Sequence, residues 1–229
     1  KITQKKFGAA MQELIFAPAG LKNTGHEEAI AVIPNQAEGY VNLPEGIIKA
    51  SFENKSYVIG AGSIYSTAED LYRWSQALLK GNLLTPAQAK RLFTKQKGRY
   101  SYGWFVSKYG WRENGKTILG ANIYHDGGSP GFECKLSILK EHDLVVIILS
   151  NQLPALVNAI VNKITNTLLG YEEPLPKSDN TQELFQTLFN KGVKQAIILI
   201  KGWKENKEMY RVPRSSKIFM IARGYLESH

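Results

Sequence analysis

The spacing of apolar residues predicts helices in the first part of the chain. Apolar side chains at one-turn intervals from Phe7 to Ile15 predict an amphipathic helix that ends before Pro18. Its inward stripe would consist of Phe7, Ala10, Met11, Leu14 and Ile15. Residues 21–60 follow no single period, and their repeated Pro and Gly residues predict a long irregular excursion with a few short strands.

Two further helices carry their own start signals. Ser66 and Glu69 stand in the S-x-x-E order of a capping box, which predicts that Ser66 is the N-cap of a helix ending at Gly81. This reading makes Ser66 a helix cap and not a nucleophile. Thr85 and Gln88, on either side of a proline in the first turn, predict the start of the next helix.

The period then changes to that of β-strands. Four runs rich in β-branched and aromatic residues predict consecutive antiparallel strands at Tyr102–Val106, Thr117–Tyr124, Phe132–Leu139 and Leu144–Ser150. A tight hairpin at residues 141–143 would precede the last of them. Because this last strand is apolar from Leu144 to Leu149, we expect it to be a central strand covered on both faces.

The C-terminal part returns to helical spacing. A helix from about Leu153 to Leu169 would cover the sheet, and Glu183–Trp203 and Ser215–Leu226 predict two more, interrupted by glycines and a proline. Two prolines and mixed charge between Tyr171 and Ser178 are typical of a linker.

These patterns predict an α+β fold, with an antiparallel β-sheet flanked by helices and a small helical C-terminal appendage. The expected division is a main domain at residues 1–172, a linker at 173–178 and an extension at 179–229. A composition of 43% hydrophobic and 21% charged residues is that of a globular protein and excludes a disordered chain. The first residues have no apolar segment behind their charges, so we expect any targeting signal to lie upstream of Lys1.

The C-terminal end of the chain is basic. The chain carries a net charge of +9, and between Asn180 and His229 nine Lys/Arg face four Glu, a net of +5. A solvated helical face explains this excess most simply, while an anionic membrane surface is the main functional alternative. No zinc-finger pattern, RNP-type signature or dense Arg run supports a nucleic-acid partner.

Few residue types that perform chemistry occur in informative places. The single cysteine, Cys134, excludes an internal disulfide and is interpreted as a small buried strand residue. His26 and His142 fall in expected turns and are interpreted as surface residues, and His229 is uninformative. No H-E-x-x-H motif or carboxylate cluster indicates a metal, and we expect no cofactor.

The densest chemical signal is the run from Tyr124 to Gly131, which reads YHDGGSPG. Glycines on a strand and turn let a substrate approach the backbone, and the exposed N–H groups suit a developing oxyanion. His125 at the end of an apolar strand therefore has two readings. It is either a hydrogen-bonded structural residue or part of a substrate-lined edge.

Four segments occur in an order that resembles the class C β-lactamase-related serine hydrolases and penicillin-binding protein homologues. They are Gly60–Trp74 (GAGSIYSTAEDLYRW), Tyr102–Trp104 (YGW), His125–Gly131 (HDGGSPG) and Ser150-Asn151. The segment Ile15–Thr24 is similar to the one that follows the family's Y-x-N motif. The resemblance covers residues 1 to about 170.

The resemblance implies roles for one short segment. His125 would take the Lys or His position of the family's third motif (K-T-G or H-x-G), Gly127 its invariant glycine, and Gly128 would supply an oxyanion-hole N–H. Tyr124, Asp126 and Ser129 would contact the bound acyl group. The substrate would be a small molecule or peptide with a β-lactam, D-peptide or ester carbonyl.

The family's first two motifs, S-x-x-K and Y-x-N, are not found in working positions. Ser137 and Lys140 match S-x-x-K as text, but residues three apart on a strand point to opposite faces. Tyr40-Val-Asn42 matches Y-x-N but follows the segment it should precede. We therefore expect a catalytically silent chain that belongs to a longer serine hydrolase, periplasmic or secreted.

Two further expectations follow from the missing motifs. Without the family's N-terminal strands the sheet would expose an apolar face, so we expect association with a missing N-terminal segment or homo-oligomerisation. The alternative function is a non-catalytic binding module of the same fold, whose basic tail docks on an anionic membrane or on a partner protein.

Overall fold

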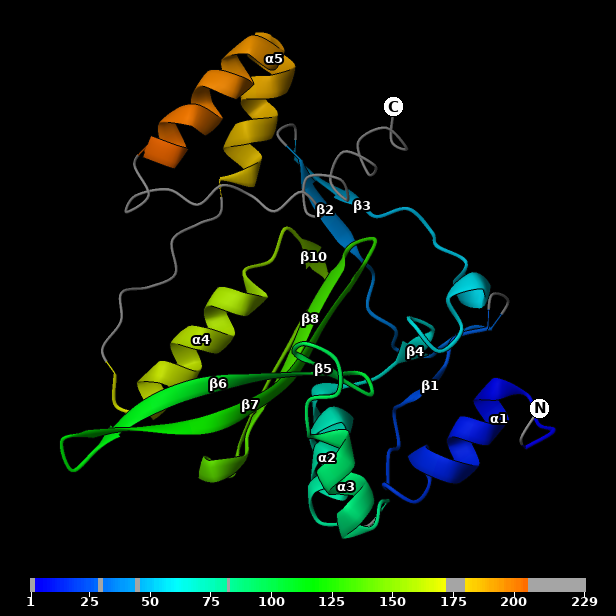
Figure 1. The fold of residues 1–229 in the computed structure, drawn as a ribbon. Coiled ribbons are helices and arrows are strands. Elements are labelled where there is room, and N and C mark those ends of the chain that lie inside the picture. Colours follow the sequence, from blue (N-terminus) through cyan, green and yellow to red (C-terminus); the bar gives the residue numbers. More distant parts are fainter. Residues whose placement is uncertain (1–2, 29–30, 44–45, 82, 172–179, 206–229) are drawn as a thin grey trace. The chain divides into compact units, whose positions relative to one another are not determined.

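The computed structural model describes residues 3–28, 31–43, 46–81, 83–171 and 180–205 (Figure 1). Internal contacts divide the chain into two units. The first comprises residues 1–35, 54–127 and 134–149, and the second residues 36–53, 128–133 and 150–229. The antiparallel sheets and accompanying helices confirm the expected α+β class. The expected linker at 173–178 and the helix at Ser215–Leu226 lie outside the described residues.

A five-stranded sheet in the order β5-β6-β7-β8-β9 dominates the first unit. Its strands are β5 (Tyr100–Ser101), β6 (Trp104–Glu113), β7 (Lys116–Ser129), β8 (Phe132–Leu139) and β9 (Leu144–Ser150). Strands that follow one another along the chain are neighbours, as the sequence predicted. The 3-10 turn η3 (Lys140–His142) connects β8 to β9, and His142 is exposed there as expected.

The pairing of β6 with β7 extends well beyond the predicted strands. Residues 105–113 pair with residues 124–116 in antiparallel register. Asn114 and Gly115 close the hairpin, and both have positive φ, as the type I′ turn of an Asn-Gly hairpin requires. The predicted strand start at Tyr102 is wrong, because Tyr102 and Gly103 have positive φ and form the turn between β5 and β6.

Helices α2 (Ala68–Leu79) and α3 (Pro86–Leu92) pack against the buried core cluster of this unit. Leu78 of α2 lies in one buried cluster with four sheet residues, Trp104, Ile123, Leu136 and Ile138. The rings of Trp74 and Trp104 stack with centroids 5.4 Å apart. Each large apolar side chain buried in this way stabilises the fold by about 1.5–3 kcal/mol. Because Ile123 of β7 belongs to this cluster, its burial holds β7 in place.

Two helix starts test the cap predictions. The Thr85–Gln88 capping box at the start of α3 is confirmed, since each side chain bonds to the other's backbone N–H. The prediction for α2 is wrong by one residue. Thr67 is the N-cap, its hydroxyl accepting the Asp70 N–H at 3.2 Å, and Ser66 bonds elsewhere.

The N-terminal helix departs from its predicted period. An α-helical turn, α1 (Phe7–Met11), passes into a π-helical segment, η1 (Gln12–Phe16). The wider π turn rotates later side chains relative to a 3.6-residue repeat. Phe16 is therefore buried, while Leu14, predicted to face inward, is exposed. His26 also differs from its prediction, because it lies in the short strand β1 (Gly25–His26) and its ring meets the edge of Phe7.

Strand β9 also departs from expectation. Among the described residues it is the last strand of its sheet, with one described neighbour, β8. Val146 is its only fully buried residue, and Leu149 is exposed. An apolar pattern typical of a central strand therefore occupies an edge.

The second unit contains a three-stranded sheet in the order β10-β2-β3. Strand β2 (Tyr40–Leu43) pairs antiparallel with β3 (Gly46–Lys49) and parallel with β10 (Gln152–Leu153). These strands confirm that the 21–60 excursion contains short strands. Helix α4 (Val157–Leu168) is shorter than predicted, since Leu153 belongs to β10, and it buries Val157, Val161 and Thr165 along one face.

Helix α5 (Thr181–Glu205) completes the second unit and confirms the helical pattern predicted there. Gly192 has non-helical angles (φ 81°, ψ 174°) and divides α5 into two arms that lie side by side (Figure 1). The arms share a small core of Leu184, Ala196 and Trp203. In the described part of the chain, no helix is both long and apolar enough to cross a membrane.

Candidate active site

The segment singled out by the sequence lies within β7 and not in a loop after it. Strand β7 continues through Ser129, so Tyr124, Asp126 and the two glycines are strand residues, and Pro130-Gly131 forms the turn to β8. His125, Gly127 and Gly128 are exposed, while Tyr124, Asp126 and Ser129 are half-buried. A strand with exposed glycines offers its backbone to a molecule that lies along it.

Two aromatic residues orient the imidazole of His125. The His125 Nε2 lies 3.2 Å from the Tyr100 hydroxyl, and its ring centroid lies 5.4 Å from that of Phe105. His125 Nδ1 lies 2.6 Å from the Asp126 carbonyl oxygen, which can only accept. A neutral imidazole must therefore carry its proton on Nδ1, leaving Nε2 to accept from Tyr100. Tyr100 and Phe105 come from β5 and β6, and no local sequence pattern indicated that they would contact His125.

Gly127 is constrained by its neighbour on β8. A Cβ added at Gly127 would lie 3.2 Å from Cys134 Sγ, tighter than ordinary van der Waals contact. Cys134 is half-buried on β8, which confirms the strand placement but not the full burial predicted for it. Glycine here therefore keeps the strand surface flat beside His125.

Gly131, the last residue of the same motif, has a packing role. Its φ is +77°, and an added Cβ would lie 2.6 Å from the backbone of Gly39. Asn151, from another family-like segment, secures the same stretch by donating from Nδ2 to the Glu38 carbonyl at 2.9 Å. Within the Tyr124–Gly131 run, His125, Gly127 and Gly128 are thus exposed, whereas Gly131 at the C-terminal end packs against Gly39.

A stripe of polar residues on β8 is buried behind this strand. Glu133, Lys135 and Ser137 alternate with Cys134, Leu136 and Ile138, a pattern that would ordinarily place the polar set in water. All three are nevertheless buried, and each has a partner. Lys135 Nζ lies 4.5 Å from the ring centroid of Tyr124, Glu133 accepts the Ala155 N–H, and Ser137 bonds to Asn122.

The same contacts test the S-x-x-K lookalike. Ser137 has no exposed surface, and its hydroxyl donates to Asn122 Oδ1 at 2.7 Å. Lys140 lies beyond the end of β8 and is exposed. This Ser and Lys do not form a nucleophile and base, in agreement with the sequence argument.

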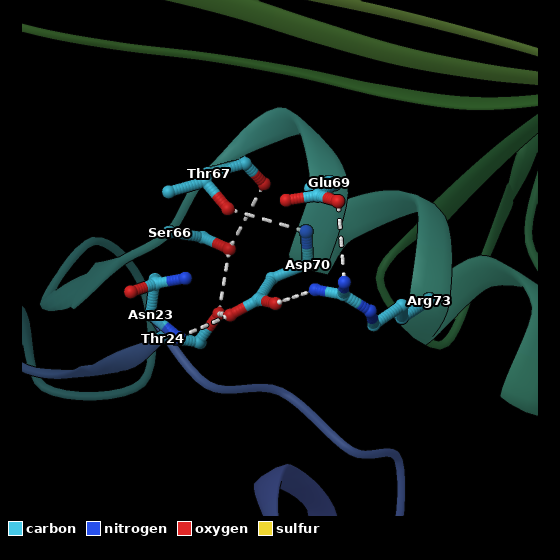
Figure 2. Close-up of polar contacts among 7 residues, drawn as sticks. All are labelled: Asn23, Thr24, Ser66, Thr67, Glu69, Asp70 and Arg73. Atoms are coloured by element: carbon cyan, nitrogen blue, oxygen red, sulfur yellow. Dashed lines mark hydrogen bonds and ion pairs between the residues drawn. The ribbon is translucent and has the colours of Figure 1, made fainter.

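A second polar cluster joins two of the family-like segments (Figure 2). Asp70 of α2 is fully buried, and its Oδ2 accepts the Asn23 N–H at 2.6 Å and the Thr24 hydroxyl at 2.9 Å. Its Oδ1 accepts from Arg73 Nη1 at 2.8 Å. The Ser66 hydroxyl lies 2.7 Å from the Thr24 hydroxyl and 3.3 Å from the Thr67 carbonyl oxygen. We name these residues the Asp70 cluster.

The electrostatics of Asp70 are those of a structural carboxylate. Burial raises its pKa, but the hydrogen bonds from Asn23, Thr24 and Arg73 outweigh burial and hold the pKa below the ordinary value of 3.8. Asp70 is therefore ionised at neutral pH and bonded on both oxygens. It anchors the segment before β1 to the start of α2, and it is not free for chemistry.

A third cluster lies at Gly120 and Ala121 in the first half of β7. Both carboxylate oxygens of Glu141 lie within 3.2 Å of the Ala121 N–H, and burial and Glu141 together raise the pKa of Tyr109 to about 12. A Cβ added at Gly120 would lie within 2.9 Å of the side chains of Glu141, Tyr109 and Trp111, so a larger residue there would displace them. In the described part of the chain, no group of three or more His, Cys, Asp or Glu is placed to hold a metal.

Comparison with known proteins identifies the class. The Beta-lactamase family model matches residues 1–169, and the chain belongs to that family. A putative penicillin-binding protein, PbpX of Bacillus subtilis, is 29% identical over 156 residues, which are 67% of this chain and 37% of the relative. Penicillin-binding protein 4* of the same species is 25% identical over 193 residues, 76% of this chain and 42% of the relative.

Solved structures agree on the fold. The penicillin-binding protein of Bacillus halodurans matches with a TM-score of 0.56 and 20% identity, over 71% of this chain and 51% of its own. A D-stereospecific amidohydrolase of Streptomyces matches with a TM-score of 0.59 and 19% identity, over 75% and 51%. The chain thus spans about two fifths of its curated relatives and about half of these structures. It has the penicillin-binding and β-lactamase fold.

Proposed function

We propose that this chain forms one wall of a serine hydrolase site that works through an acyl-enzyme. The observation that carries the proposal is the exposed His125 on β7, oriented by Tyr100 and followed by the exposed glycines Gly127 and Gly128. An acyl group lying along β7 would meet the Gly128 N–H, whose role is to polarise the carbonyl oxygen. Tyr124, Asp126 and Ser129 would line its path.

The names of similar proteins support the class of substrate. The relatives are named penicillin-binding proteins, and the structural matches include a D-stereospecific amidohydrolase and D-amino acid amidases. A β-lactam, D-peptide or ester carbonyl is consistent with both groups. We also propose a periplasmic or secreted location, which fractionation of the source cells would test.

The nucleophile in this proposal comes from polypeptide outside these 229 residues. Nucleophile and base act as a unit in acyl transfer, so a chain without them loses nearly all of the rate. We therefore expect no labelling of this chain alone by a fluorescent penicillin or a fluorophosphonate. Labelling of a serine in this chain would overturn the assignment.

A second experiment tests the proposed wall itself. A longer polypeptide that supplies S-x-x-K and Y-x-N motifs should become labelled, and His125→Ala should slow its acylation by about a hundredfold. Ile118→Ala, at an exposed β7 residue remote from this segment, is the matched control and should leave labelling unchanged. Equal labelling of the His125 variant would contradict the proposed role.

We further propose that β9 pairs with a strand supplied by that longer polypeptide or by a second copy. An apolar edge strand presents unpaired N–H and C=O groups and is prone to association. Light scattering of this chain should therefore report dimers or larger species. A stable monomer at high concentration would contradict the proposal.

A further inference from the structure

The second arm of α5, from Val193 to Glu205, is apolar on two faces. Its inner face is the expected one, since Ala196 and Trp203 pack with Leu184 of the first arm, and Leu199 and Ile200 add to the contact. This small core accounts for the helical hairpin. It does not account for the aliphatic residues on the opposite side.

The outer face combines three aliphatic side chains with two lysines. Val193, Ile197 and Ile198 are 63%, 47% and 60% exposed. Lys194 and Lys201 are also exposed, and each lies three or four positions from both isoleucines. On a helix this spacing places every lysine beside two isoleucines.

Exposure to water does not explain three aliphatic side chains on this face. A helix that packs one side on its partner ordinarily carries polar residues on the other side. Lysine stems lie along apolar surface while their ammonium groups reach outward, so the five side chains suit a boundary between an apolar and an anionic layer.

We infer that this outer face, defined by Val193, Lys194, Ile197, Ile198 and Lys201, docks in the plane of an anionic lipid bilayer. Charge complementarity selects the occupant. By sequence, residues 193–205 carry three Lys and one Glu, a net of +2. Residues 206–229 add five Lys/Arg and two Glu, a net of +3. Anionic headgroups attract the lysines, and the aliphatic side chains enter the headgroup boundary.

This inference is independent of the serine hydrolase proposal, because no residue of α5 belongs to the proposed wall. Either can fail while the other stands. If both hold, the hairpin would keep an acyl-transfer domain close to a membrane surface.

The test is co-sedimentation of the complete 229-residue chain with vesicles of phosphatidylglycerol and, in parallel, of phosphatidylcholine. We expect binding to the first that weakens as salt is added, and little binding to the second. Failure to bind phosphatidylglycerol vesicles, or equal binding to both lipids, would overturn the inference.

Two double variants separate the charge from the apolar contribution. Lys194→Gln with Lys201→Gln should weaken binding by roughly fivefold for each lysine removed. Ile197→Ser with Ile198→Ser should weaken it by about tenfold or more. Since all four side chains are exposed, helicity and the melting temperature should stay close to those of the parent chain, which circular dichroism would check.

Matched controls use equally exposed residues elsewhere. Leu119→Ser with Leu168→Ser removes two aliphatic side chains, and Lys116→Gln with Lys140→Gln removes two charges. Both should bind like the parent chain. The inference is wrong if these controls lose as much binding as the α5 variants. It is also wrong if the isoleucine variant still binds heparin and its lipid binding is unchanged, because the attraction would then be one of general charge.

Discussion

The Asp70 cluster and the His125 segment both belong to stretches that resemble the same family, yet they differ in burial and in hydrogen bonding. Asp70 is fully buried, bonded on both carboxylate oxygens and closed to solvent. His125 is exposed, bonded to the Tyr100 hydroxyl and the Asp126 carbonyl, and followed by exposed glycines on the same strand. A family-like motif therefore marks two kinds of residue, those that hold the fold together and those that are kept accessible.

The largest expected effect is on the buried side of this comparison. Asp70→Ala should lower the free energy of unfolding by about 3 kcal/mol, because it leaves the Asn23 N–H and the Arg73 guanidinium without their acceptor. Urea denaturation measures the change. A loss below about 0.5 kcal/mol, the range of ordinary surface changes, would remove the distinction between the two regions.

The two ends of the Tyr124–Gly131 run provide the next test. Gly131→Ala should cost about 2 kcal/mol, since it strains a residue at φ +77° and pushes a Cβ toward the Gly39 backbone. Gly128→Ala, in the exposed extended strand, is the comparison and should cost well under half as much. Equal losses of stability for the two variants on thermal melting would show that Gly131 is no more tightly packed than Gly128.

Acid should weaken the Asp70 cluster specifically. Because the folded-state pKa of Asp70 lies below its unfolded value of 3.8, its contribution is complete above that pH and is lost as the pH falls through the folded pKa. The unfolding free energy of the parent chain should therefore fall more steeply below about pH 4 than that of Asp70→Asn. Parallel slopes in urea titrations would show that Asp70 keeps an ordinary pKa.

Changes around His125 should have the smallest effect on stability. Tyr100→Phe removes the hydroxyl that meets Nε2 but keeps the ring against Phe105, so we expect a loss of under about 1 kcal/mol. The His125 ring should nevertheless reorient, which the nitrogen chemical shifts of the imidazole would report. Unchanged shifts would mean that Tyr100 does not position His125.

His125→Ala itself should leave the unfolding free energy within about 0.5 kcal/mol of the parent chain. An exposed side chain whose partners are one hydroxyl and the carbonyl of the next residue contributes little to folding. A loss comparable to that of Asp70→Ala would favour the structural reading of His125 over the site reading.

Much of this molecule could be predicted from local sequence signals. The order of helices and strands follows from apolar spacing, and the Thr85–Gln88 capping box requires only residues three apart. The Asn114-Gly115 hairpin was not among the predicted elements, although an Asn-Gly pair favours two central residues with positive φ. The Tyr124–Gly131 run, too, was visible as an unusual set of glycines beside a histidine.

Contacts between segments distant in sequence could not be predicted from local patterns. Thr24 lies 46 positions from Asp70, so no local pattern reveals that Ser66 bonds to Thr24 and leaves the cap to Thr67. The buried Lys135 contradicts its alternating pattern because a neighbouring strand supplies the Tyr124 ring as a partner. Residue spacing along the chain thus determines which helices and strands form. Burial and the polar partners on neighbouring segments determine which residues stabilise the fold and which remain accessible to solvent.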